Sequence, residues 1–143
     1  CRGGGSPGRG TRLMDLDAKS EARLLSVHPD LARVVRAAAR ETLLSFIVTE
    51  GVRTLEKQKA LVAAGASRTM RSRHLPNADG LACAVDLAAL VAGQARWDWP
   101  LYDQLAMTMK EAAGREGVAL EWGGDWVSFR DGCHFQLPWE LYP

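Results

Sequence analysis

The stretch Leu81–Val91, with the sequence LACAVDLAALV, decides the fold class, because it is a strand-like apolar run interrupted by a single charge. Short runs of aliphatic residues bounded by turn residues are typical of buried strands. An acidic side chain inside such a strand is costly to bury unless it is paired or binds a metal ion. Asp86 is therefore the strongest single indication of a functional site in the chain.

Two polar motifs accompany this strand in the sequence. Ser72-Arg73-His74 precedes it, and the segment 131–136, DGCHFQ, follows near the end of the chain. With Asp86 they offer two imidazoles and a carboxylate, and Asp131 adds a second carboxylate three residues before His134. A catalytic zinc site has this composition, with three protein ligands, an open position for water and a base beside it.

The remaining segments predict several helices and short strands. An apolar face at helical spacing predicts a helix over residues 30–43, and Thr54 is a cap for a second helix that ends near Gly65. Pro100 and Gly117 bound a third helix. We expect further strands over residues 45–49, 119–122 and 133–137. Because no regular βαβ alternation is present, the fold class is α+β, with helices packed on a small, mainly antiparallel sheet.

Composition restricts the class of protein. The chain has 143 residues, 47% hydrophobic and 24% charged, and a net charge of +1, so we expect one catalytic domain over residues 14–143 that binds no nucleic acid. Residues 1–13, rich in glycine and arginine, are expected to form a flexible tail. No apolar run is long enough to span a bilayer and no signal peptide is visible, although the chain begins at Cys1 rather than Met. We expect a monomer.

The motifs resemble a family of zinc peptidoglycan peptidases. The resemblance rests on the Ser-x-His motif at residues 72–74, AVDL at 84–87, EWGGDW at 121–126 and DGCHFQL at 131–137, and it extends from about residue 25 to residue 137. This family includes the VanY-type D-alanyl-D-alanine carboxypeptidases and the phage endolysins that cut L-alanyl-D-glutamate bonds. The segment 46–54, FIVTEGVRT, is similar to the endolysin branch. The fold that the resemblance implies is of the Hedgehog/DD-peptidase type.

The resemblance implies roles for particular residues. It makes His74, Asp86 and His134 the ligands of Zn²⁺ and Asp131 the catalytic carboxylate, and it makes Arg53 and Ser72 substrate-binding residues. One departure from the family is a longer spacing between the first two ligands, which we interpret as a turn-forming insertion over residues 76–80. This insertion leaves the ligand types intact and changes the rim expected for the cleft.

Several assignments stay open at this stage. Glu121 is the alternative base to Asp131, or it pairs with a cation. Arg53 is expected to stabilise an oxyanion or bind a substrate carboxylate, and Ser72 either binds substrate or closes a turn. Other residues have expected structural roles: Trp122 and Trp126 in the core rather than in a cleft wall, Asp125 bonding backbone amides in its turn, and His28 in packing or at the surface.

The cysteines could be metal ligands, disulfide partners or free thiols. Three are too few for a disulfide framework. Cys83 and Cys133 flank the expected ligands, so they could bind metal or pair with each other. Strand alternation predicts instead that each faces away from its neighbouring ligand, which favours buried free thiols.

The function that follows is hydrolysis of an amide bond in the peptidoglycan stem peptide. We expect an endolysin-like, bacteriolytic L-alanyl-D-glutamate endopeptidase that acts on the cell wall, with a D-alanyl-D-alanine carboxypeptidase as the near alternative. Without a signal peptide it would be a phage or prophage lysin released from the cytoplasm, or a chain whose upstream segment is missing. Two rivals are a non-catalytic wall-binding module of the same fold and a structural metal domain closed by a cysteine ligand.

Overall fold

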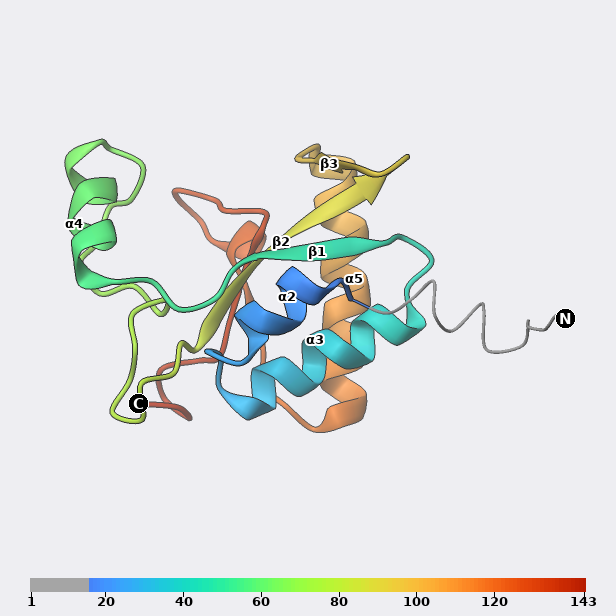
Figure 1. Ribbon diagram of the computed structural model, residues 1–143, viewed down its shortest axis with the longest axis horizontal. Helices are drawn as coiled ribbons and strands as arrows, with labels where there is room; N and C mark the ends of the chain where they lie inside the picture. The colour runs from blue at the N-terminus through green and yellow to red at the C-terminus, as the bar shows by residue number, and fades with distance from the viewer. Residues whose placement is uncertain (1–15) are drawn as a thin grey trace, which may run out of the picture.

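A small antiparallel sheet forms the centre of the computed structural model, which describes residues 16–143 (Figure 1). Its strands follow the order β1-β2-β5-β4, and β3 pairs with the outer part of β2. Every pairing between these strands is antiparallel. The strands are β1 (Phe46–Glu50), β2 (Ala84–Val91), β3 (Gln94–Arg96), β4 (Glu121–Trp122) and β5 (His134–Gln136).

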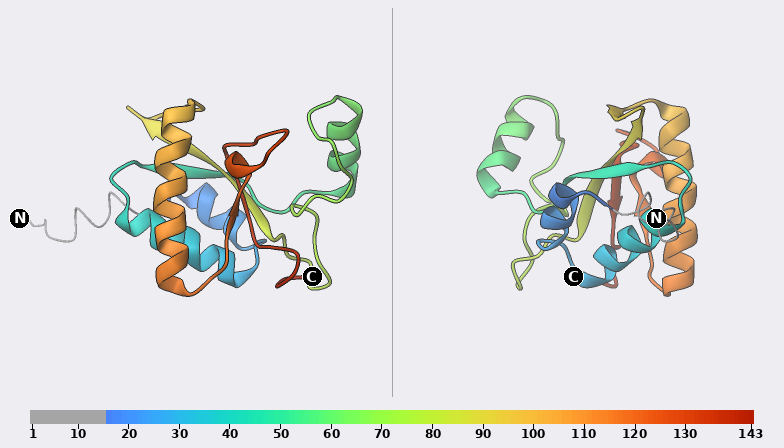
Figure 2. Two further views of the ribbon diagram at one scale, coloured as in Figure 1. Left: turned by 180° about the vertical axis from the view of Figure 1, so that it is seen from behind. Right: turned by 45° about the vertical axis from the view of Figure 1, so that its right-hand side comes forward.

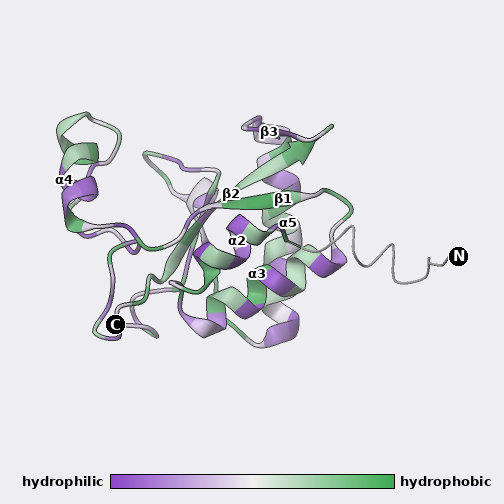
Figure 3. Cartoon of the chain, in the orientation of Figure 1, coloured by the Kyte–Doolittle hydropathy of each residue, from purple (hydrophilic) through white to green (hydrophobic). Residues whose placement is uncertain are grey.

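Helices α3 (Pro29–Glu41) and α5 (Trp99–Glu116) pack against each other and supply much of the core. Their buried residues form one cluster with apolar side chains of the sheet, in which Val85, Leu87 and Phe135 are completely buried. Burial of this apolar surface is the main force that holds the layers together. Figure 3 colours β1 and β2 mostly hydrophobic, as expected for strands that line a core.

Helix α2 (Ala18–Leu24) lies beside β1 and was not predicted from the sequence. Its N-cap is Asp17, whose carboxylate accepts a hydrogen bond from the backbone N–H of Ser20. The hydroxyl of the fully buried Ser20 in turn accepts a hydrogen bond from the N–H of Val48 on β1. A short helix is thus tied to the sheet by polar contacts as well as by apolar packing.

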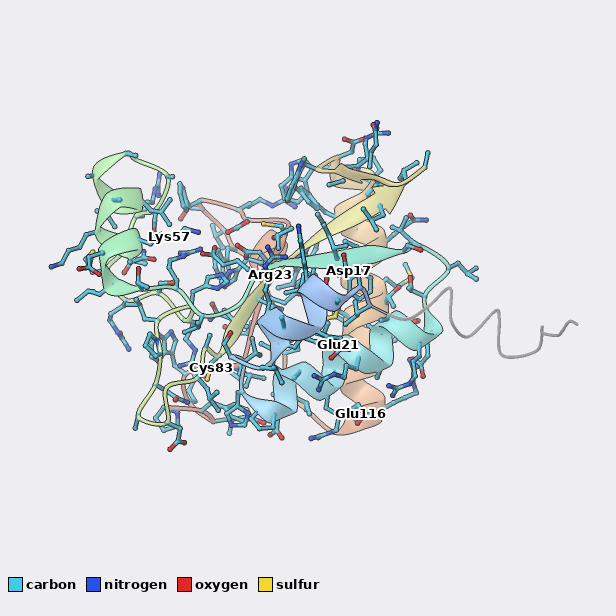
Figure 4. All side chains as sticks on the ribbon, in the orientation of Figure 1. Asp17, Glu21, Arg23, Lys57, Cys83 and Glu116 are labelled. Carbon is cyan, nitrogen blue, oxygen red and sulfur yellow. The ribbon has the colours of Figure 1, made fainter. Side chains whose placement is uncertain are left out.

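Helix α4 (Leu55–Ala63) stands away from α3 and α5 in all views (Figures 1 and 2). Its N-cap is Thr54, as predicted, and its only buried residue is the polar Gln58. Figure 4 marks Lys57 on this helix and Glu116 at the far end of α5, on opposite sides of the molecule. We call the part of the chain from residue 54 to residue 72 the α4 arm.

The predicted α+β class with a small antiparallel sheet is confirmed, and most element boundaries move by a few residues. Strand β3 was missed because its three residues are all exposed and show no apolar periodicity. The two glycines of the EWGGDW motif begin a short 3₁₀ helix, Gly123–Asp125. The predicted tail, residues 1–13, lies outside the described residues. Between residues 16 and 143, no helix is both long and apolar enough to cross a bilayer.

Candidate active site

A row of polar residues crosses the centre of the sheet. Asp86 on β2 is paired in register with His134 on β5 and with Glu50 on β1. Side chains directly opposite each other on neighbouring strands project from the same face of a sheet. The neighbours of Asp86 along β2, Val85 and Leu87, are buried in the core cluster. The sheet therefore separates an apolar face from a face that carries ionisable groups.

His74 joins this row from the loop that follows the α4 arm. Its backbone N–H donates to the hydroxyl of Ser72, and its carbonyl accepts from the N–H of Arg53. Its side chain is almost completely buried, and its ring lies 5.0 Å from the ring of His134. Two segments distant in sequence thus bring the two imidazoles together.

The three expected ligands converge on one point. The Nε2 atom of His74 and the Nδ1 atom of His134 lie 3.2 Å and 3.3 Å from Oδ1 of Asp86. Together the three side chains form a group whose donor atoms all lie within 4.8 Å of one another. Two imidazole nitrogens and a carboxylate oxygen are a set of donors suited to zinc.

The other nitrogen of each imidazole has a hydrogen-bond acceptor. His74 donates through Nδ1 to the carbonyl of Gly51 over 2.8 Å, and His134 donates through Nε2 to Oε1 of Gln136 over 2.8 Å. With those protons in place, the nitrogens facing Asp86 carry lone pairs in the neutral rings. Three sets of lone pairs pointing at one another repel unless a cation, either a metal ion or a proton on one imidazole, lies between them. This arrangement, in which outer partners orient imidazole ligands, fits a metal site.

Electrostatics support the same conclusion. Burial would raise the pKa of the Asp86 carboxyl, but hydrogen bonds and charge from His134 and His74 lower it well below its usual value. Burial would lower the pKa of His134, and contact with Asp86 raises it instead. Asp86 therefore remains an anion at neutral pH and is available as a ligand.

Asp131 lies next to this group on the approach to β5. Its N–H donates to the carbonyl of Gly123, and a side chain at Gly123 would collide with Asp131, because a Cβ there would lie 2.4 Å from the carbonyl oxygen of Asp131. The indole of Trp122 holds the following residue by donating to the carbonyl of Gly132. A carboxylate oxygen of Asp131 lies within 4.8 Å of one from Asp86. The 3₁₀ turn thus fixes a second carboxylate beside the three ligands.

Glu121, the alternative base, has a different environment. Its Oε1 accepts a hydrogen bond from Nε2 of Gln136, whose Oε1 accepts from His134. No cation pairs with it in the described part of the chain. Glu121 is thus the outer end of a hydrogen-bond chain behind His134, and it is absent from the lining of the cavity described below.

Arg53 is engaged by several partners. Its guanidinium binds both carboxylate oxygens of Glu50 and donates to Oε1 of Gln58, and it lies 3.9 Å from Asp86. Lys57 also pairs with Glu50, and burial, which raises the pKa of Glu50, is outweighed by these two cations, which lower it. Arg53 is thus fixed beside the ligand group by its partners. Ser72 closes the turn before His74 and also borders the cavity.

The group opens into a cavity of about 440 Å³ between the sheet and the α4 arm. Trp126 stands over it with its ring 5.2 Å from that of His134, so this residue walls the cleft, contrary to the expectation that it belongs to the core. Trp122 does lie in the core, stacked on Phe135. The lining includes Glu50, Arg53, Ser72, His74, Asp86, Trp126, Asp131, His134 and Gln136.

One cysteine prediction is wrong. Cys133 does not face away from the site: its thiol donates to Oδ1 of Asp131 over 3.2 Å and lies near Asp86. The reason is that Cys133 precedes β5 and lies in a turn, where strand alternation does not apply. Cys83 is buried outside both groups of possible ligands. Both are free thiols, and burial raises the pKa of each.

Two further expectations differ from the structure. Asp125 forms an ion pair with Lys110 on α5, over 2.7 Å, where we expected bonds to backbone amides. The insertion over residues 76–80 does form a turn, in which the side chain of Asn77 accepts from the N–H groups of Asp79 and Leu81. It borders a separate cavity beside Cys83 rather than the one with the ligands. His28 caps α3 and packs against Tyr142, a structural role as expected.

Sequence reasoning missed the supporting residues of the site. Glu50, Gln58 and Gln136 hold Arg53 and His134 in place through hydrogen bonds between side chains. For Gln136, its place two residues after a ligand on a strand was an available signal, because such residues share a face. For Gln58 the signal was a polar residue on the otherwise apolar stripe of a short helix.

Comparisons with known proteins agree with this geometry. A sequence model of the phage L-alanyl-D-glutamate peptidase family matches residues 13–134. The L-alanyl-D-glutamate peptidase of Listeria phage A118 is 35% identical over an alignment of 119 residues that covers 78% of this chain and 40% of that protein. The peptidase of the same name from Escherichia phage T5 is 27% identical over an alignment of 116 residues that covers 78% of this chain and 81% of that protein.

A solved structure is similar throughout. The crystal structure of the Serratia marcescens L-Ala D-Glu endopeptidase ChiX superposes with a TM-score of 0.83 at 42% sequence identity, covering 96% of this chain and 99% of that one. This chain spans about 40% of the length of the Listeria phage relative. Because the family match extends over most of the sequence and includes every residue of the proposed ligand group, the chain belongs to the phage L-alanyl-D-glutamate peptidase family.

Proposed function

We propose that this protein hydrolyses the amide bond between L-alanine and D-glutamate in the stem peptide of peptidoglycan, with zinc bound by His74, Asp86 and His134. The observation that carries the proposal is the convergence of two oriented imidazole nitrogens on one buried carboxylate. Family membership supports this choice of bond, and peptidoglycan as the substrate would make the cell wall the site of action.

Zinc held there supplies a Lewis acid for the amide carbonyl and a more acidic water. The side chains of the protein do the remaining work. Asp131, fixed beside the ligands, accepts the proton of the attacking water and delivers it to the nitrogen of the departing glutamate. Arg53, 3.9 Å from Asp86 and held by Glu50, places a fixed positive charge beside the reacting carbonyl. Trp126 covers the imidazole of His134 and limits access of water from that side.

The test is digestion of purified peptidoglycan followed by mass spectrometry of the released fragments. We expect a new amino terminus on glutamate, zinc close to one per chain, and loss of release with a chelator that is reversed by added zinc. Release of free D-alanine would identify a carboxypeptidase instead. A protein that binds the wall and releases nothing, with or without zinc, would contradict the proposal and favour a binding module.

A further inference from the structure

The wall of the cavity formed by residues 66–71 carries two arginines that have no acidic partner in the described structure. Arg68 and Arg71 line the cavity, and neither pairs with a carboxylate among residues 16–143. Three other cations line the cavity. Arg53 and Lys57 are both paired with Glu50. The guanidinium of Arg73 donates to the carbonyls of Leu137 and Tyr142. The cavity therefore has two guanidinium groups that are available to an anionic ligand.

Both guanidiniums lie over aromatic rings from other walls of the cavity. The Cζ atom of Arg68 is 4.7 Å from the ring centre of Phe129, and that of Arg71 is 4.4 Å from the ring centre of Trp139. Stacking restricts the orientation of the planar group and leaves its N–H edge accessible. That edge matches the two oxygens of a carboxylate.

The backbone of this segment is held from behind by a buried side chain. Gln58, fully buried, donates through Nε2 to the carbonyl of Thr69 over 2.6 Å and to the hydroxyl of Ser67 over 2.9 Å. The hydroxyl of Thr69 then accepts from the N–H of Arg71 over 2.8 Å. The two arginines are thus presented by a fixed segment rather than by an unsupported surface loop.

The proposed substrate has the complementary chemistry. A glutamate residue has two carboxyl groups, and its onward peptide bond uses only one, so the other stays free close to the scissile amide. Any further residue with a spare carboxyl adds another. We infer that Arg68 and Arg71 form a subsite that binds a free carboxylate of the stem peptide, an inference that rests on the proposed function. The protein would then favour stems whose carboxyls are not amidated.

The experiment compares soluble stem peptides that differ in one group. One peptide has all carboxyls free, one has the spare carboxyl of glutamate as an amide, and one has the spare carboxyl of a later residue as an amide. Turnover is measured for the wild type, Arg68→Gln and Arg71→Gln. The matched control is Arg40→Gln, an exposed arginine on α3 that also has no acidic partner among the described residues. Affinities are measured on the Asp131→Asn protein, because binding can then be recorded without cleavage of the peptide.

We expect the free acid to be preferred by about 10- to 100-fold in kcat/KM, mainly through KM, because a charge-assisted contact is lost in the amide. Whichever amide reduces affinity identifies the carboxylate that is bound. Each arginine variant should lose most of this preference, while the Arg40→Gln variant keeps it. Zinc content should be the same in all of them.

Equal affinity of the wild type for all three peptides would overturn the inference. So would variants that are slower only on intact wall and normal on soluble peptides, because the arginines would then serve a wall polymer instead. Cleavage at another bond, or none, contradicts the proposed function and is read from the products. The comparison of affinities does not depend on which bond is cut, so it still tests the role of the two arginines.

Discussion

Asp86 lies in a strand position that would ordinarily hold an apolar side chain, between the buried residues Val85 and Leu87. Its cost of burial is offset by two imidazoles, and each imidazole is oriented by a second acceptor, Gly51 or Gln136. The ligand group therefore depends on backbone and side-chain partners as well as on the ligands themselves. Asp131 differs from these residues because it lies beside the proposed ligand group and is not itself proposed as a ligand.

Replacing Asp131 by asparagine should separate proton transfer from metal binding. The amide has nearly the same shape, so we expect the fold and the zinc content to be kept, while the rate falls by about 10²–10⁴-fold because the proton acceptor is lost. The measurement is turnover and zinc content on the same preparation.

Glu121→Gln is the matched control for this variant. A glutamine there still offers an oxygen to Nε2 of Gln136, so the hydrogen-bond chain behind His134 can persist and the rate should stay near that of the wild type. A normal rate for Asp131→Asn together with an inactive, zinc-loaded Glu121→Gln would reverse the assignment of the base.

Helix α4 shows how a segment can be held without an apolar core. Only Gln58 is buried on this helix, and its amide links Arg53 to the backbone at Thr69. The arm therefore depends on a few hydrogen bonds, each of which is costly to leave unmade in a buried place. The arm also supplies one wall of the cavity, so its anchoring bears directly on substrate binding.

Replacing Gln58 by leucine should loosen the α4 arm. The side chain keeps its bulk but leaves the Thr69 carbonyl and the Arg53 guanidinium without their partner, and we expect the free energy of unfolding to fall by about 1–3 kcal/mol. Urea denaturation measures the change in the free energy of unfolding. Amide hydrogen exchange should become faster over residues 66–72. Lys59→Ala, on the exposed side of the same helix, should change neither. Unchanged exchange in the leucine variant would show that other contacts hold the arm.

The elements that could be predicted from the sequence are those with strong periodicity or clear caps. Helix α3 and strand β2 carry long apolar patterns, and Thr54 and Gly117 mark helix ends by capping chemistry. Helix α2 and strand β3 are short, and their signals are weak because tertiary contacts stabilise them. The prediction for Cys133 was wrong for a related reason. Cys133 lies in a turn, where side chains do not alternate between two faces as they do in a strand.

The grouping of His74, Asp86 and His134 could be predicted because chemistry restricts which residue types can bind a metal, and a resemblance placed them in order. The sequence marked Gln136 and Gln58 only as polar residues in unusual positions. Their partners, His134 and Arg53, depend on side-chain geometry that one sequence does not encode locally. The position of Trp126 could not be predicted for the same reason. It was expected in the core, but it forms part of the cavity wall. Pairwise contacts between distant segments are therefore what the structure adds.

Residues 137–142 link two other segments of the described structure. Arg73, next to His74 of the proposed ligand group, donates to the carbonyls of Leu137 and Tyr142 over 3.1 Å and 2.6 Å. The hydroxyl of Tyr142 donates to Asp30 on α3 over 2.7 Å, and its ring packs edge-on against that of His28. The contacts thus join the start of α3, the C-terminal segment and the loop that carries His74.

The contact between Tyr142 and Asp30 gives the stability of the molecule a pH dependence. The Tyr142 hydroxyl, with a smaller contribution from Arg33, lowers the pKa of Asp30 below its ordinary value of 3.8, and Asp30 raises the pKa of Tyr142 above 10.0. A lowered carboxyl pKa stabilises the fold above the unfolded value and loses this effect as the pH falls through the folded value. A raised phenol pKa stabilises the fold below its unfolded value and loses the effect as the pH rises through the folded one.

Replacing Tyr142 by phenylalanine keeps the ring beside His28 and removes the hydrogen bond to Asp30. We expect the melting temperature at neutral pH to fall slightly, by about 1–3 °C, because the pair is partly exposed to solvent. The difference from the wild type should be greatest from about pH 5 to about pH 9, and it should narrow in acid as Asp30 gains a proton and in alkali as Tyr142 loses one. Thermal unfolding measured below, within and above this range covers both limbs. Tyr102→Phe is a control for the acid limb, because no described side chain or backbone group accepts a hydrogen bond from the Tyr102 hydroxyl. Burial raises the pKa of Tyr102, so this variant does not serve as a control in alkali. A difference that stays constant at all pH values would mean that the hydroxyl acts through packing and not through the charge of Asp30.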